Sequence, residues 1–237
     1  LVVGTSAWHL VKGRRDELVK KSFSMGLWMV LVTSCLQVVI GDNHGLNTRE
    51  HQPAKLAAME GHWETNHNEP MPLLLFAIPD MKEERNHFEV GVPYLGSLIL
   101  THSLDGQVTG LKDFAPEDRP NSTIVFWSFR VMVGLGFVML IVFAAAFWQS
   151  TRHQIEEKKW VLKAALFSLP LPWIAIECGW FVAEYGRQPW TISEVLPTFM
   201  SASSLTTGDL WFSIISISLF YTVLLVIEIF LMLKFAR

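Results

Sequence analysis

The chain has 237 residues, of which 51% are hydrophobic and only 17% are charged, with a formal net charge of −3 and a mean hydropathy of +0.32. A soluble domain normally carries about 25% charged residues, so this composition excludes an ordinary soluble core and indicates a lipid environment. Ten Trp and sixteen Phe add the aromatic excess typical of membrane interfaces and cofactor pockets.

Four apolar runs are long enough to cross a hydrocarbon layer, which takes roughly 20 helical residues. The predicted transmembrane helices are residues 23–40, 124–148, 161–184 and 210–233. A fifth run, residues 1–11, is too short to span, opens on Leu and lacks the features of a signal peptide. We expect it to be the end of a truncated transmembrane helix, in the C-terminal part of a longer membrane protein.

Basic residues in short segments predict the orientation of these helices, because Lys and Arg favour the cytoplasmic side. Such residues are concentrated in residues 12–22, 149–160 and 234–237, the last of which ends on Arg237. If the four spans alternate in direction, all three segments lie on one side, which is then the cytoplasm. The segments left to face outward are residues 41–123 and 185–209.

The long outer loop is predicted to be a folded polar excursion. Within it, QPAKLAAMEGHWE predicts a short helix, with Pro53 suited to the first turn and Gly61 to the end. The run GVPYLGSLILTH is apolar, but at about twelve residues it is too short to span, and we expect it to lie at the membrane interface.

Polar side chains inside the predicted spans are informative because a charge near the bilayer centre is costly unless it is paired or hydrated. Glu177, Trp180 and Glu184 follow at intervals of three and four, which places them on one helix face. Arg130 and Met132 lie near the same membrane surface. These residues are compatible with a structural ion pair and ordinary packing, or with a haem site in which Met ligates iron and Arg neutralises a propionate.

Several motifs resemble subunit I of the cytochrome bd quinol oxidases. The pentapeptide GRQPW, preceded by PLPWIAIECGWFVAEY and followed by TISEVLPT, is similar to the most characteristic stretch of that subunit. KLAAMEGHWE, FRVMVGLGF and EIFLMLKFAR resemble it in the same order, so the similarity runs through essentially the whole chain. The loop between GHWE and FRVM is short, as in the branch that lacks a long insertion. The resemblance implies an all-α, polytopic transmembrane helix bundle, with four complete spans, the end of a fifth and a large polar outer loop.

The resemblance also implies roles for residues that match the family motifs. Met132 corresponds to an axial ligand of the low-spin b haem, and Arg130 to a cation that stabilises the same haem. Glu184 corresponds to the carboxylate ligand of the high-spin b haem, and Trp180 to an aromatic residue between haem sites. Arg187 is expected to hold haem propionates. The histidine ligands of the family lie on earlier helices that this sequence does not include.

The remaining roles concern quinol and protons. Lys55 and Glu60 match the outer-loop pair implicated in quinol oxidation, and Glu177 is a candidate for an inward proton path. Because Lys55 and Glu60 are five residues apart, they stand about 140° from each other on a helix and are not expected to pair.

The function implied is that of a terminal respiratory oxidase in the bacterial inner membrane. It would oxidise quinol, reduce oxygen to water through b- and d-type haems, and generate a proton gradient without pumping. The expected partners are membrane lipid, a second subunit, a small single-span subunit and the earlier helices of the same subunit, with no nucleic acid. Apart from the motifs, the polarity pattern also permits a membrane transporter or proton-coupled channel subunit without haem, or a structural half that acquires chemistry only with further helices.

Overall fold

A computed structural model describes residues 1–67, 69–152, 154–155 and 157–235, so Arg237 of the predicted basic tail lies outside the described residues. The chain divides into two units, Leu1–Pro197 and Thr198–Arg237. Among the described residues, four helices are long and apolar enough to cross a membrane: Glu17–His51, Pro116–Thr151, Lys159–Tyr185 and Thr207–Lys234. The prediction of four complete spans is confirmed.

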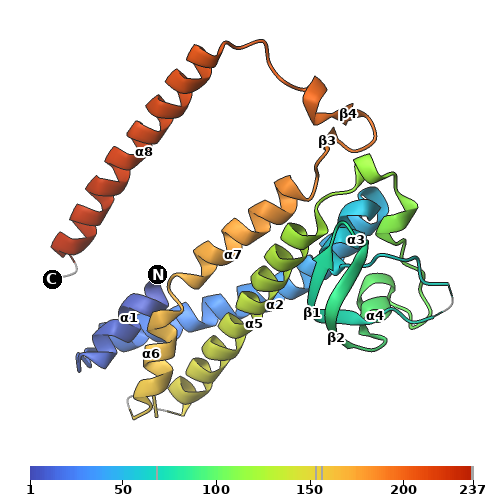
Figure 1. The fold of residues 1–237 in the computed structure, drawn as a ribbon. Helices are drawn as coiled ribbons and strands as arrows, with labels where there is room; N and C mark the ends of the chain where they lie inside the picture. The colour runs from blue at the N-terminus through green and yellow to red at the C-terminus, as the bar shows by residue number, and fades with distance from the viewer. Residues whose placement is uncertain (68, 153, 156, 236–237) are drawn as a thin grey trace. The chain divides into compact units, whose positions relative to one another are not determined.

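The first unit is mainly helical (Figure 1). Its helices are α1 (Val2–Val11), α2 (Glu17–His51), α3 (Pro53–Glu60), α4 (Leu95–Thr101), α5 (Ser122–Thr151), α6 (Lys159–Phe167), α7 (Leu171–Trp180) and the π-turn η3 (Phe181–Tyr185). Short 3-10 turns are η1 (Leu111–Asp113) and η2 (Pro116–Asp118), and the strands are β1 (Leu73–Asp80), β2 (Arg85–Val92), β3 (Trp190–Ile192) and β4 (Leu196–Pro197). The second unit contains η4 (Thr198–Met200) and α8 (Thr207–Phe235).

Helix α2 is longer than the span predicted at residues 23–40, because it continues through polar sequence to His51. Hydropathy marks only the part of a helix that suits lipid, whereas the helix itself continues until something stops it. Here Pro53, which lacks a backbone N–H and begins the next helix, follows one residue after Gln52. The predicted loop 41–123 therefore starts as helix, and the true inter-span segment is residues 52–121.

The predicted single helix 161–184 is interrupted, which corrects the sequence prediction. Helix α6 ends at Phe167, α7 starts at Leu171, and the last turn widens into the π-turn. Pro170 and Pro172 explain the break, since each removes a backbone donor and clashes with the carbonyl four residues earlier. The kink and the π-turn both change the direction of the segment that carries Glu184.

Two hydrophobic clusters hold the first unit together at different levels of the bundle. One joins α1, α2, the end of α5 and α6, with Phe23, Leu27 and Ala146 among its buried residues. It brings together the helix ends that flank the two basic connections. The other joins α3, η1, the start of α5 and the π-turn, through residues such as Ala57 and Val182.

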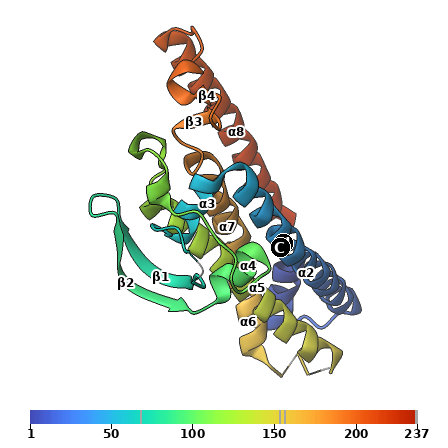
Figure 2. The same cartoon turned by 90° about the vertical axis from the view of Figure 1, so that its right-hand side faces the viewer.

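The inter-span segment contains the predicted short helix and one element that was not predicted. Helix α3 begins at Pro53 and is capped by Gly61 in the left-handed region, at φ 64°, so that prediction is confirmed. The apolar run near Leu95 forms helix α4. Strands β1 and β2 form an antiparallel hairpin, in which Leu73 pairs with Val92 and Asp80 with Arg85, and which packs against α5 and α4 (Figure 2).

The second unit is dominated by α8, whose 29 residues correspond to about 43 Å of helix at 1.5 Å per residue. This length exceeds the hydrocarbon thickness of about 30 Å. The helix has the predicted span 210–233 at its centre and a Thr206–Asp209 hydrogen-bonded turn at its start.

Candidate functional site

A buried ion pair lies between α3 and α5. The Arg130 Nη2 donates to Glu60 Oε2 at 2.6 Å, and Arg130 Nε donates to the Leu74 carbonyl of β1 at 2.5 Å. The side chains of Arg130 and Glu60 are 11% and 3% exposed. The guanidinium carbon also lies 4.7 Å from the centroid of the Phe126 ring. Arg130 therefore connects two elements of the inter-span segment, α3 and β1, to α5.

The sequence builds this contact by letting α3 approach α5 closely. Ala57 and Ala58 are fully buried small residues, and the Ser122 hydroxyl at the start of α5 donates to the Ala58 carbonyl at 3.1 Å. Gly61 ends α3 against the Phe126 ring, where an added Cβ would stand 3.2 Å from the ring. Since Glu60 is the last residue of α3, the cap fixes its carboxylate over Arg130.

Met132 lies where α5 and α7 pack against each other. A Cβ added at Gly179 of α7 would be only 3.0 Å from the Met132 sulfur, so a larger residue there would displace the thioether. An isolated Gly in an apolar helix indicates a close approach, which is the sequence signal that could have identified Gly179. Glu177 lies two residues before Gly179 and Trp180 directly after it, and both are exposed, with Trp180 at 58%.

The π-turn presents Glu184 beside Arg187. The two side chains form an ion pair across a three-residue interval and are 46% and 36% exposed. Arg187 Nε is buried and has no hydrogen-bond partner among the described residues. π-turns within helices are frequent at functional sites because they redirect a side chain without ending the helix. The Glu184 side chain is thus partly exposed beside Arg187 at the end of this segment.

Lys55 of α3 contacts the same turn. Its Nζ donates to the Ala183 carbonyl at 3.2 Å, and a Cβ added at Gly186 would stand 3.4 Å from its side chain. Burial lowers the pKa of the Lys55 ammonium, the charge of Arg187 lowers it further, and the charge of Glu184 opposes both effects. A cavity of about 70 Å³ beside this contact is lined by residues that include Gln52, Lys55, Phe114, Arg187, Gln188 and Trp190.

The structure divides the predicted site residues into two groups. Glu60 joins Arg130, whereas Lys55 joins Glu184 and Arg187, so the two residues expected to serve quinol point to different neighbours. Their five-residue spacing explains why they diverge. Neither of these long-range contacts could be predicted from the sequence, because each joins residues far apart in the same chain.

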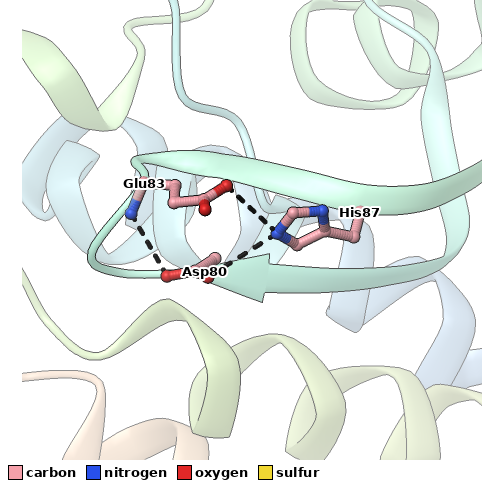
Figure 3. Close-up of side chains that lie close together, drawn as sticks. All are labelled: Asp80, Glu83 and His87. Carbon is pink, nitrogen blue, oxygen red and sulfur yellow. Dashed lines mark hydrogen bonds and ion pairs between the residues drawn. The ribbon is translucent and has the colours of Figure 1, made fainter.

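A second polar cluster lies at the turn of the β1–β2 hairpin (Figure 3). His87 Nε2 is 3.6 Å from Asp80 Oδ2 and 3.5 Å from Glu83 Oε2. Asp80 Oδ1 already accepts the backbone N–H groups of Lys82 and Glu83, and Glu83 is paired with Arg85 at 2.5 Å. Because a guanidinium already neutralises Glu83, these contacts explain the cluster as a hydrogen-bonded turn, which needs no ion.

Chemically, the arrangement at α5 and α7 fits haem. A thioether, an exposed carboxylate and an arginine with an unpartnered buried Nε have the chemistry required of a soft axial ligand, an anionic ligand and a donor to a propionate. These groups lie on helices that also present Trp180. Two nitrogens of Arg130 donate to Glu60 and to the Leu74 carbonyl, and its role as a cation for the low-spin haem stays a prediction.

Comparison with solved structures shows that this chain has the fold of a bd oxidase, which is a membrane helix bundle. The solved bd oxidase from Geobacillus thermodenitrificans superposes with a TM-score of 0.85 at 29% identity, over 98% of this chain and 53% of that one. The family model "Cytochrome bd terminal oxidase subunit I" matches residues 1–237. The chain belongs to the family of cytochrome bd terminal oxidase subunit I, a family of haem-containing oxidases, and is a multi-pass protein of the inner membrane.

Curated relatives agree with this assignment. The chain is 36% identical to the cytochrome bd-II ubiquinol oxidase subunit 1 of Escherichia coli, over 100% of the chain and 58% of the relative. It is 32% identical to the cytochrome bd ubiquinol oxidase subunit 1 of Bacillus subtilis, over 98% and 52%. The chain thus spans about half the length of the curated relatives it matches.

Proposed function

We propose that the chain forms part of a terminal oxidase that oxidises quinol and reduces oxygen to water through b- and d-type haems. The single observation that carries this proposal is the geometry at the π-turn, where Glu184 lies exposed beside Arg187 with its unpartnered buried Nε. An exposed carboxylate on an apolar helix is costly in a membrane unless a positive charge compensates it. Arg187 supplies part of that charge, and in the proposed assembly a ferric haem iron supplies the rest.

In this proposal Met132 and Glu184 are the iron ligands of the low-spin and high-spin b haems. When bound, the haems supply one-electron chemistry that carries electrons from quinol to oxygen. Gly179 lets the Met132 thioether lie against α7, and the unpartnered Nε of Arg187 would donate to a propionate. Trp180 directly follows Gly179, which contacts Met132, and precedes Glu184 by four residues, which suits an aromatic residue between haems.

Quinol oxidation releases two electrons and two protons, so the site needs a proton acceptor near the low-spin haem. We assign that role to Glu60, with Lys55 holding a ring oxygen. Arg130 holds the Glu60 carboxylate at 2.6 Å, and it precedes Met132 by two residues on α5. Arg130 then acts on the haem through its fixed charge and orients Glu60, in addition to its predicted role as a haem cation.

The orientation predicted from Lys and Arg places these residues near the outer surface. Protons from quinol leave outside, while protons for water come from the cytoplasm, so the reaction charges the membrane without pumping. Glu177, exposed on α7, is our candidate for the inward path. The proposed assembly includes membrane lipid, a second subunit, a small single-span subunit and the half of subunit I that the relatives have beyond the matched region.

A spectrum and one variant test the function. The purified assembly should show b- and d-type bands on reduction, and Glu60→Gln, which keeps the hydrogen bond to Arg130, should slow quinol oxidation without changing those bands. Oxygen consumption from an artificial electron donor that bypasses quinol is the control and should be unchanged. A colourless assembly would contradict the oxidase and favour the transporter alternative.

A further inference from the structure

The strongest feature outside the proposed chemistry is the contact of Lys55 with the π-turn. Lys55 is the third residue of α3, yet its ammonium donates to the carbonyl of Ala183, which is 128 residues later in the chain. The residue after Ala183 is Glu184. Gly186 completes the contact, because the aliphatic stem of Lys55 occupies space 3.4 Å from where a Cβ would stand. Lys55 is partly buried there.

Helix chemistry explains what this hydrogen bond does. The last four carbonyls of a helix have no partner within it, and the helix end carries partial negative charge, so a cation that donates to one of them is stabilising. The π-turn ends at Tyr185, with the Gly186 N–H bonded to the Phe181 carbonyl at 3.3 Å. Gln188 Nε2 donates to the Glu184 carbonyl at 3.5 Å, and Lys55 supplies, from a distant helix, a donor for the Ala183 carbonyl.

We propose that Lys55 is a positioning residue that caps the C-terminal end of the π-turn and so fixes the carboxylate of Glu184. The ammonium has three donors, and only one is used by Ala183, so this role is compatible with a contact to quinol. The neighbouring Val182 is buried in the hydrophobic cluster that contains Ala57 of α3, so α3 and the π-turn also pack against each other beside the hydrogen bond of Lys55. The claim that the cap positions Glu184 as a haem ligand rests on the proposed function, whereas the cap itself does not.

The test compares lysine variants in the purified, assembled enzyme. Lys55→Met keeps the aliphatic stem and removes the charge and donor. Lys112→Met is the matched control, since Lys112 lies in the same inter-span segment but pairs with exposed Glu64. Backbone amide exchange across residues 181–188 should be about tenfold faster in Lys55→Met, because a hydrogen bond from a charged donor is lost. Lys55→Arg, which retains a donor and a charge, should restore most of the protection.

A second readout follows the high-spin b haem. Its absorption band should shift or weaken in Lys55→Met and not in Lys112→Met. The band of the low-spin haem, whose proposed ligand is Met132, should be unchanged in both variants. Unchanged exchange at 181–188 would overturn the cap, and faster exchange with an unchanged high-spin band would overturn the positioning of Glu184. If Glu184→Gln itself keeps the full haem complement, the proposed haem role has failed, and the exchange measurement alone decides the cap.

Discussion

Two acid–arginine pairs stand at the same level of the first unit and differ in nearly every physical respect. Glu60–Arg130 joins two helices, is almost fully buried, and has Arg130 fixed additionally by the Leu74 carbonyl. Glu184–Arg187 lies within one turn, and both side chains are more than a third exposed. The buried pair is a completed structural unit, whereas the exposed pair is available to a third group.

The energetic consequence of each pair follows from its solvation. Breaking a buried pair by removing one partner leaves an uncompensated charge and is strongly destabilising, whereas an exposed pair is screened by solvent and contributes little. Mutations at the two pairs should therefore impair different properties of the protein. Truncation of Glu60 should damage the fold first, and removal of the Glu184 charge should damage cofactor retention first.

The largest expected effect is on stability at the buried pair. Glu60→Ala leaves Arg130 buried without its carboxylate and should cost about 3–5 kcal/mol. Thermal unfolding of the solubilised enzyme, followed by tryptophan fluorescence, should show a clearly lower midpoint than wild type. The matched variant Glu184→Ala should cost about 1 kcal/mol or less. Equal losses in the two variants would remove the distinction between the pairs.

A double variant sharpens this prediction. Replacing both Glu60 and Arg130 by Leu removes both buried charges and should recover part of the loss, since well-packed apolar residues often substitute for a buried ion pair without penalty. The recovery will be incomplete, because the Leu74 carbonyl also loses its donor. Strictly additive losses would show that the two side chains do not interact.

The second effect concerns the exposed pair. Glu184→Gln keeps the shape of the side chain but removes its negative charge, so the high-spin b haem should be depleted while the protein still assembles. Haem quantification and the reduced-minus-oxidised spectrum measure this. A full haem complement in the variant would mean that the carboxylate is structural.

The third effect concerns Met132. Met132→Leu keeps the volume nearly unchanged, with an expected stability cost below about 1.5 kcal/mol, but it removes the thioether. The low-spin band should disappear while the high-spin bands persist. An unaltered spectrum would exclude Met132 as a ligand.

The smallest effect should come from Gly179→Ala. Alanine favours a helix by about 0.5–1 kcal/mol relative to glycine, yet its Cβ would stand 3.0 Å from the Met132 sulfur. The thioether must move by a few tenths of an ångström, so the midpoint potential of the low-spin haem should shift while haem content is kept. Gly134→Ala, which meets nothing within 4 Å, is the control. The same potential in both variants would mean that this contact does not tune the haem.

The sequence was sufficient for elements that depend on local chemistry. Apolar length predicted the spans, and Pro53 with Gly61 predicted both ends of α3. The break at Pro170 and Pro172 carried a visible signal that hydropathy alone obscured. The hairpin was missed because β1 reads LLLFAIPD, a continuous apolar run without the alternation that marks a half-buried strand.

Contacts of the site could be predicted only in part. Motifs identified Glu60, Arg130, Lys55 and Glu184, but the way they are paired depends on packing between α3, α5 and the π-turn. Glu60 and Arg130 are 70 residues apart, and Lys55 and Ala183 are 128 apart. A single sequence has no local pattern that encodes such pairings, so only the folded structure supplies them.

The most direct test of the account is a cofactor-containing structure of the assembled oxidase, determined in the membrane-embedded state. The account predicts one haem iron within coordinating distance of the Met132 sulfur, a second within coordinating distance of the Glu184 carboxylate, and Lys55 still bonded to the Ala183 carbonyl. Haem irons ligated entirely by other residues, with Glu184 paired only to Arg187, would contradict it.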